Sequence, residues 1–277
     1  MREATGSGDV FDAPGLRARV VIDGVRRVSP RFVFKGYSDE VQGPFVQPYL
    51  GEDGLLEGRL AALLVETEAH LVLVDTGMGL YGASVGAGHV LDQLAAVDVR
   101  PWDVDTVLIT HGHADHVGGI LDPQGRPVFA DARHVWHSVE ADFWASDEAG
   151  ALPDDAGEPA LAALVALLNA GLLERIEGDN EIVPGVRAIA APGHTPGHLA
   201  VVVGEDLLWA GDAFVGMLNV PHPGWVSAAD MDGPTNEATR RALLARAAED
   251  DLTLAACHMP VSGRVARDGD AYALVPG

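Results

Sequence analysis

Short apolar runs, each about the length of a β-strand, alternate with turns rich in Gly and Pro along most of the chain. In the first half the pattern predicts strands at Arg17–Ile22, Arg26–Val28, Phe32–Phe34, Leu60–Glu66, Leu71–Val74, Thr106–Ile109, Val128–Phe129 and His134–Trp136. In the second half it predicts strands at Val186–Ala190, Leu199–Val203, Leu207–Ala210, Thr253–Ala256, Arg264–Arg267 and Tyr272–Val275. Between these runs, Tyr37–Glu57 is rich in Gly, Pro and acidic residues, which predicts a long loop.

Helices are predicted where apolar residues recur at helical spacing: Val90–Val97, Val139–Ala145, Pro159–Leu173 and Glu237–Ala248, the last with Thr235 as N-cap. Strands in both halves with helices between them are typical of two packed sheets covered by helices. No Gly/Ser-rich or Pro-rich linker divides the chain, so we predict one domain over residues 15–277. Residues 1–14, which hold Gly, Ser, Asp and Glu, are predicted to be a disordered lead.

The 277-residue chain is acidic, with 18 Lys and Arg against 41 Asp and Glu and a net charge of −23. Such a charge repels phosphate backbones and anionic lipid, so we expect neither nucleic-acid nor membrane partners. No apolar stretch reaches the roughly 18 residues of a membrane helix, and no secretory signal is visible, which predicts a cytoplasmic protein. Cys257 is the single cysteine, which excludes an intramolecular disulfide and a cysteine-based zinc cluster.

The densest group of candidate ligands directly follows the apolar run Thr106–Ile109. His111, His113, Asp115 and His116 lie within six residues of one another, separated only by Gly and Ala. On an extended or turning backbone the first two histidines can converge on one ion, while the last two residues point toward a second ion. Imidazole and carboxylate donors suit Zn²⁺. The sequence therefore predicts a metal site at the end of this strand.

Three later segments repeat the arrangement of an apolar strand, a tight turn and a donor. They contain His194 and His198 in Pro-Gly-His-Thr-Pro-Gly-His, then Asp212 in Ala-Gly-Asp, then His258. Loops at strand ends are where sheet-based sites assemble, so these donors are expected to join the first group. Cys257, beside the last histidine, is expected to be a small buried apolar residue rather than a thiolate ligand.

The combined pattern H-x-H-x-D-H, PGHTPGH, Gly-Asp and a late His resembles the metallo-β-lactamase-fold hydrolase superfamily, and Val74-Asp75-Thr76-Gly77 matches its early strand-end motif. The resemblance implies an α/β (α+β) fold, an αββα sandwich of two mixed β-sheets flanked by helices. It assigns His111, His113 and His194 to one metal, Asp115, His116 and His258 to the other, and Asp212 as the bridge. Asp75 would orient a ligand imidazole by a hydrogen bond, and His198 would be a structural residue at a strand start.

The resemblance also implies a mechanism, in which two Zn²⁺ ions per chain hold a bridging hydroxide that attacks a small-molecule substrate. Asp115 and Asp212 are the candidate catalytic residues, the former also as a proton shuttle. The stretches around Glu140 to Trp144 and from Gly211 to Arg241 look like the branch holding acyl-homoserine lactonases and methyl parathion hydrolase. We therefore expect a lactone or a carboxylic ester as the substrate, and a homodimer as a candidate assembly.

Two alternatives stay open: phosphotriester or β-lactam hydrolysis by the same centre, and a mononuclear iron oxygenase of the persulfide type. Some lactonases carry a tyrosine just after the bridging aspartate, where this chain has Phe214. Without that hydroxyl, the metals or a residue such as His222 would polarise the substrate carbonyl. The candidate residues of an apolar substrate pocket are Phe45, Tyr49, Phe143, Phe214, Met217, His222 and Trp225.

Overall fold

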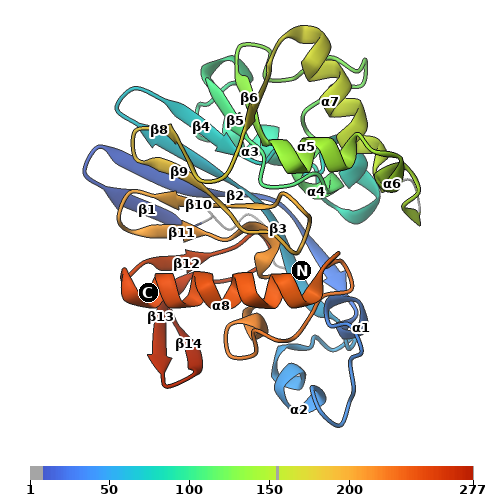
Figure 1. The fold of residues 1–277 in the computed structure, drawn as a ribbon, viewed down its shortest axis with the longest axis vertical. Helices are drawn as coiled ribbons and strands as arrows, with labels where there is room; N and C mark the ends of the chain where they lie inside the picture. Colours follow the sequence, from blue (N-terminus) through green and yellow to red (C-terminus); the bar gives the residue numbers. More distant parts are fainter. Residues whose placement is uncertain (1–8, 154–155, 277) are drawn as a thin grey trace.

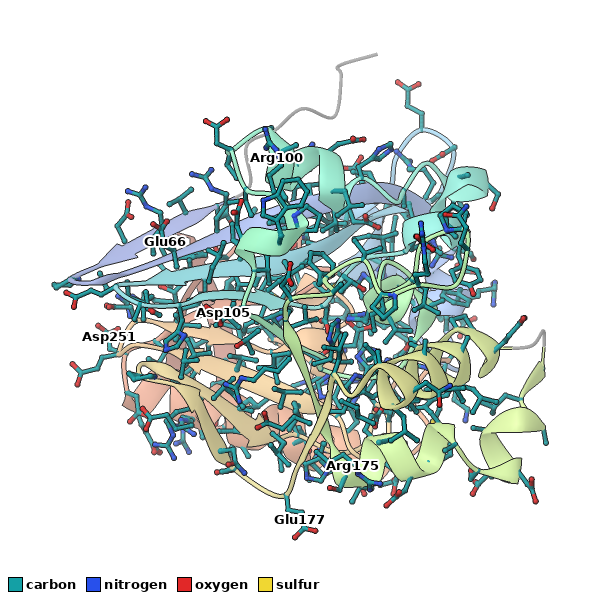
Figure 2. The ribbon with its side chains drawn as sticks, turned by 90° about the horizontal axis from the view of Figure 1, so that it is seen from above. Glu66, Arg100, Asp105, Arg175, Glu177 and Asp251 are labelled. Atoms are coloured by element: carbon teal, nitrogen blue, oxygen red, sulfur yellow. The ribbon has the colours of Figure 1, made fainter. Side chains whose placement is uncertain are left out.

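The computed structural model describes residues 9–153 and 156–276, and in this part of the chain two mixed sheets of seven strands lie face to face. The first sheet contains, in spatial order, β1 (Val10–Ala13), β2 (Leu16–Val28), β3 (Leu56–Thr67), β4 (Leu71–Val74), β5 (Thr106–Leu108), β6 (Arg133–His137) and β7 (Leu173–Ile176). The second contains β14 (Ala271–Pro276), β13 (Gly263–Asp268), β12 (Thr253–Ala255), β11 (Leu207–Trp209), β10 (Leu199–Val203), β9 (Val186–Ala190) and β8 (Asn180–Val183). Figure 2 shows the sheets as two layers, with the acidic side chains of Glu66, Glu177 and Asp251 projecting from the periphery.

Helices cover the outer face of each sheet. Over the first sheet lie α3 (Val90–Ala95), α5 (Ser138–Trp144) and α7 (Glu158–Ala170), and over the second lies α8 (Gly233–Glu249) (Figure 1). Shorter helical segments are α1 (Pro30–Val33), α2 (Gly43–Val46), α4 (Ala114–Val117), α6 (Asp147–Gly150), η1 (Gln47–Tyr49), η2 (Gly79–Val85), η3 (Pro101–Asp103), η5 (Gly211–Ala213) and η6 (Met217–Asn219). The predicted αββα sandwich is confirmed. None of the described helices has both the length and the apolar character that a membrane crossing requires.

The interior has three apolar layers, one between the sheets and one beneath the helices on each outer face. Central strands are buried on both faces, so β10 is a continuous apolar run in which every residue is buried. The outward residues of such strands pack against helices, and the inward residues pack against the opposite sheet. This double burial explains why the apolar runs in the sequence predicted most central strands.

Strand direction determines where the loops that bear the candidate donors meet. In the first sheet β4, β5, β6 and β7 are parallel, and in the second β11 and β12 are parallel. The carboxyl ends of parallel strands lie at one edge of a sheet, so the loops after β4 and β5 are neighbours, as are those after β11 and β12. Asp75, the donors from His111 to His116, Asp212 and His258 follow these strands, and His194 follows β9.

Capping residues explain two differences between the predicted and the observed elements. Phe32–Phe34 is not a strand, because Ser29 caps the helix α1 and Pro30 occupies its first turn. Helix α8 begins before the predicted Glu237. Its N-cap is Asp232, whose carboxylate accepts hydrogen bonds from the backbone N and the hydroxyl of Thr235, the residue predicted to be the cap.

Val128–Phe129 is also not a strand. It lies in a bend after Pro127, which pairs with Leu121 only as an isolated bridge, while Phe129 is buried beneath the helices. The sequence pattern did not predict β7 and β8, since each is only four residues long with a mixed burial pattern.

The prediction of a disordered lead over residues 1–14 is wrong for Val10–Ala13, while residues 1–8 lie outside the described part of the chain. These four residues form β1, which pairs with the start of β2 in an antiparallel hairpin. The hairpin forms because Gly15, at φ +72°, allows a tight turn that other residues would adopt only with strain.

Candidate metal centre

The seven predicted ligands converge where the two sheets meet. His111, His113, Asp115 and His116 come from the loop after β5 and from α4, His194 from the loop after β9, Asp212 from η5 after β11, and His258 from the loop after β12. The side chains are buried or half-buried. Their positions place donors from both sheets around one small volume.

One group of donors contains three histidines. The Nδ1 atom of His113 lies 2.9 Å from Nε2 of His111 and 3.0 Å from Nε2 of His194. The Oδ2 atom of Asp212 lies 3.8 Å from Nε2 of His111 and 3.5 Å from Nε2 of His194. The four residues therefore offer ligand atoms that all lie within 4.8 Å of one another.

The second group shares the same aspartate. His258 Nε2 lies 2.9 Å from Asp212 Oδ2, and His116 Nε2 lies 3.3 Å from Asp212 Oδ1. Asp115 completes this group, with its Oδ2 atom 3.5 Å from His258 Nε2 and its Oδ1 atom 3.9 Å from His116 Nε2. The Asp212 carboxylate thus faces both groups, as a bridging ligand must.

Hydrogen bonds on the far side of each ring determine which nitrogen faces inward. The Nδ1 atoms donate outward, from His116 to Asp75 (2.8 Å), from His194 to Asp230 (2.9 Å), from His258 to the Arg59 carbonyl (2.7 Å) and from His111 to the Thr110 hydroxyl (3.1 Å). A neutral imidazole has one N–H group, so in its neutral form each of these rings directs the lone pair of its Nε2 atom into the site. Converging lone pairs repel unless a cation lies among them.

Two further observations fit a cation. Among the described residues, the buried atoms Nε2 of His116 and Oδ1 of Asp212 have no hydrogen-bond partner. Burial lowers the pKa of His113 to about 3, so that ring is neutral, which is its ligating form. Burial opposes protonation of His258, yet the neighbouring charges and hydrogen bonds, with the charge of Asp212 the largest of them, together outweigh it and raise that pKa well above its ordinary value. The negative potential at this carboxylate therefore favours a cation, and the donor set fits Zn²⁺.

Asp75 occupies the orienting position predicted for it. Its backbone has φ +64°, and its carboxylate accepts hydrogen bonds from the backbone N and the hydroxyl of Thr110, each at 2.8 Å, as well as from His116. The same contacts hold the loop that begins the donor motif. Asp75 therefore fixes both the ring and the backbone beside it.

His198 and Cys257 are engaged elsewhere. His198 donates from Nδ1 to the Ala191 carbonyl at 3.0 Å and accepts at Nε2 from the backbone N of Asp212 at 3.0 Å, so neither nitrogen is left for a metal. This is the structural role that was predicted. The Cys257 thiol, although near the second donor group, donates to the Ala61 carbonyl at 3.0 Å inside the core between the sheets.

The family model of the metallo-beta-lactamase superfamily matches residues 58–258, which include every one of the seven donors. The chain belongs to this superfamily. An N-acyl homoserine lactonase of a Bacillus species is 28% identical over 54% of this chain, and the match spans 60% of that lactonase. A probable metallo-hydrolase of Mycobacterium tuberculosis is 31% identical over 65% of this chain and 66% of its own length.

Solved structures share the whole fold. AidC, a dizinc quorum-quenching lactonase in complex with a product, superposes with a TM-score of 0.88 over 98% of both chains at 22% identity. The hydrolase AbOPH of the beta lactamase superfamily superposes with a TM-score of 0.87 over 99% of both chains at 24% identity. At these identities the likeness establishes the superfamily fold over the full length of the sandwich.

The sequence assigned no role to Glu140, whose side chain contacts two of the loops that carry donors. Its buried carboxylate accepts hydrogen bonds from Gly112 N (2.9 Å), Trp144 Nε1 (2.6 Å), Thr195 Oγ1 (2.8 Å) and Gly197 N (2.8 Å). It thus links α5 to both histidine loops. A Cβ atom at Gly112 would lie 2.4 Å from the Trp144 indole, and one at Gly197 would lie 2.3 Å from the backbone of Glu140. Both motifs therefore require glycine at these positions.

Asp230 and Arg240 form a second group of contacts that the sequence did not predict, on the outer side of the His194 ring. Asp230, which accepts the Nδ1 proton of this ring, is also bound at 2.8 Å by the fully buried guanidinium of Arg240 on α8. Arg240 further donates to the carbonyls of Ala213, Pro223 and Trp225. One buried side chain therefore positions both the hydrogen-bond partner of His194 and the loop that follows Asp212.

We expect Asp230→Asn to weaken the metal centre by about 10- to 100-fold, the usual effect of losing the carboxylate partner of a ligand histidine. The amide cannot hold the Nδ1 proton as strongly, and it breaks the ion pair with Arg240. Metal affinity is measured by competition with a chromophoric chelator, alongside kcat/KM. Asp232→Asn is the matched control, because asparagine also caps helices and Asp232 does not contact the histidine ring. Unchanged metal affinity in the Asp230 variant would contradict this role.

A cavity of about 290 Å³ opens onto the donors His113, Asp115, His194, Asp212 and His258. Much of its wall is apolar and comes from Val28, Phe32, Val33, Leu60 and Val215. The polar side chains of Arg26 and Ser227 also line it. The cavity therefore presents the donor set to an apolar chamber that a small molecule can enter.

None of the seven residues predicted for the substrate pocket lines this cavity, although a neighbouring cavity shares Val28, Val33 and His258 with it. Phe214 is buried beneath α8, and Phe143, on α5, packs against the apolar cluster beneath the helices. Phe45, His222 and Trp225 form an aromatic cluster, while Tyr49 and Met217 line the neighbouring cavity of about 60 Å³. Much of the wall comes from the end of β2 and from α1, two segments that the sequence predicted to be strands outside the pocket. The direction of a side chain in a loop cannot be deduced from periodicity.

Proposed function

We propose that this chain is a dinuclear zinc-dependent hydrolase that cleaves a lactone or a carboxylic ester. The observation that supports this most is the Asp212 carboxylate, which faces two groups of inward-pointing nitrogens at once. A carboxylate shared in this way is suited to two cations. The relatives named as N-acyl homoserine lactonases support a lactone among the candidate substrates.

When bound, the two ions would supply an activated water molecule and a Lewis acid at the scissile carbonyl. The histidines and Asp212 hold the ions, and the apolar walls exclude bulk water from the acyl group. Water adds to the acyl carbon, the bond from this carbon to the ester oxygen breaks, and an acid and an alcohol are released. Asp115 lines the cavity, so its carboxylate oxygen is placed to take the proton from water and return it to the leaving oxygen.

The substrate class is tested with purified, metal-replete protein and a panel of homoserine and other lactones, aryl and alkyl esters, a phosphotriester and a β-lactam. We expect two zinc ions per chain and turnover of lactones or esters. Aryl esters should react faster than alkyl esters, because Phe214 offers no hydroxyl to the carbonyl and His222 stacks on Trp225 outside the cavity. One iron per chain, or turnover of only the phosphotriester or the β-lactam, would overturn the proposal.

A further inference from the structure

The wall of the cavity includes Arg26. Among the described residues, no hydrogen bond or ion pair engages its half-buried guanidinium, although acidic residues outnumber basic ones by 41 to 18 in the sequence. Its neighbour Arg27 shows the usual arrangement, since it is bound by Asp53 and lies 3.9 Å from Glu57. A partly desolvated guanidinium keeps five unused donors, so it is suited to bind an anion.

The pairing of strands directs this side chain into the cavity. Arg26 lies opposite Gly58 in the β2–β3 ladder, and both residues line the cavity, whereas Arg27 points to the other face. A Cβ atom at Gly58 would make only ordinary van der Waals contacts, the nearest at 3.8 Å to the side chain of Val28, so no bulky group fills the position above this glycine. The absence of a side chain at Gly58 leaves the guanidinium accessible to a ligand.

Arg26 and five of the metal donors line the same cavity, so one small molecule could contact both. A volume of about 290 Å³ is at the lower end for small-molecule sites. The cavity wall also includes Val28, Val33 and Leu60, which offer no polar side-chain atoms. A ligand that fills this space therefore has one polar end at the donors, an apolar middle and a second polar end at Arg26.

We propose that Arg26 binds a carboxylate at the end of the substrate's acyl group remote from the scissile bond. This inference rests on the proposed hydrolysis of an ester or lactone. A guanidinium binds a carboxylate through two parallel hydrogen bonds, and the apolar surroundings strengthen the pair. A chain of net charge −23 repels anionic substrates over most of its surface, so a local cation is needed to hold one.

The first test compares two nitrophenyl esters of equal chain length, one ending in a methyl group and one ending in a carboxylate. In Arg26→Gln, kcat/KM for the carboxylate ester should fall by about 10- to 100-fold, mainly through KM, while the neutral ester changes by less than about twofold. Arg26→Lys should retain part of the preference. Arg27→Gln is the matched control and should leave both esters unchanged. Equal losses for the two esters, or no loss, would overturn the assignment.

The second test measures binding without turnover, by calorimetry of dicarboxylates from succinate to suberate against monocarboxylates of the same length. The wild-type protein should bind one length of dicarboxylate more tightly than its monocarboxylate, and Arg26→Gln should abolish that difference. If no ester or lactone is hydrolysed, the proposed function fails, but this titration still decides the role of Arg26. If the extra affinity appears only for acyl chains with a neutral keto oxygen, the carboxylate assignment is wrong.

Discussion

Asp212→Ala should lose at least one of two bound metal ions, and kcat/KM should fall by several orders of magnitude. Within the described part of the chain, this carboxylate is the only donor that faces both groups of nitrogens, at 3.3 and 2.9 Å on one side and 3.8 and 3.5 Å on the other. Without it, two cations would face each other across a gap with no negative charge between them, and their repulsion would empty a site. Elemental analysis and steady-state kinetics on the same preparation measure both effects.

Asp206→Ala is the matched control for that variant. Asp206 lies just before β11, at the opposite end of the strand from Asp212, and its side chain is exposed. This control should keep full metal content and activity. If Asp212→Ala instead retained two ions and kept kcat/KM within about tenfold of the wild type, the bridging role would be wrong.

Removal of metal by a chelator should abolish nearly all turnover, and added zinc should restore it. The cavity residues include Ser227, but its hydroxyl contacts only the backbone N of Ala229 among the described residues, so no base activates it as a nucleophile. We therefore expect water to be activated at the metal donors. The measurement is activity against residual metal content during dialysis.

The control for chelation is the same treatment with chelator already saturated with zinc, which should leave activity intact. This separates loss of metal from any direct effect of the chelator on the protein. Full activity in a sample verified to be metal-free would overturn both the metal centre and the proposed function.

The central strands could be predicted from the sequence because burial on both faces leaves continuous apolar runs such as Leu199–Val203. The donors could be located because each follows a strand end, where His, Asp and Gly stand out against apolar neighbours. Short edge strands such as Asn180–Val183 could not be predicted, since their mixed pattern matches many loops. Phe32–Phe34 was misassigned because the cap at Ser29 overrides its strand-like composition.

The residues that hold the donor loops and rings in place were harder to predict than the donors themselves. Glu140 and Asp230 are distant in sequence from the rings or loops that they hold, and only the packing of α5 and α8 brings them there. A carboxylate in a helix or loop is ordinary in composition, so no local pattern marks it. The pocket residues Phe143 and Phe214 were misassigned for the related reason that an aromatic residue near a motif points into a core as readily as into a cavity.

The division of the donors between the two sheets has a mechanical consequence. Each donor group draws histidines from both layers of the sandwich, His111 and His113 with His194, and His116 with His258. Ions held there would join the layers as a cross-link does, in a chain whose single cysteine, Cys257, rules out an intramolecular disulfide. Cohesion between the layers and chemistry at the centre would then depend on the same few bonds.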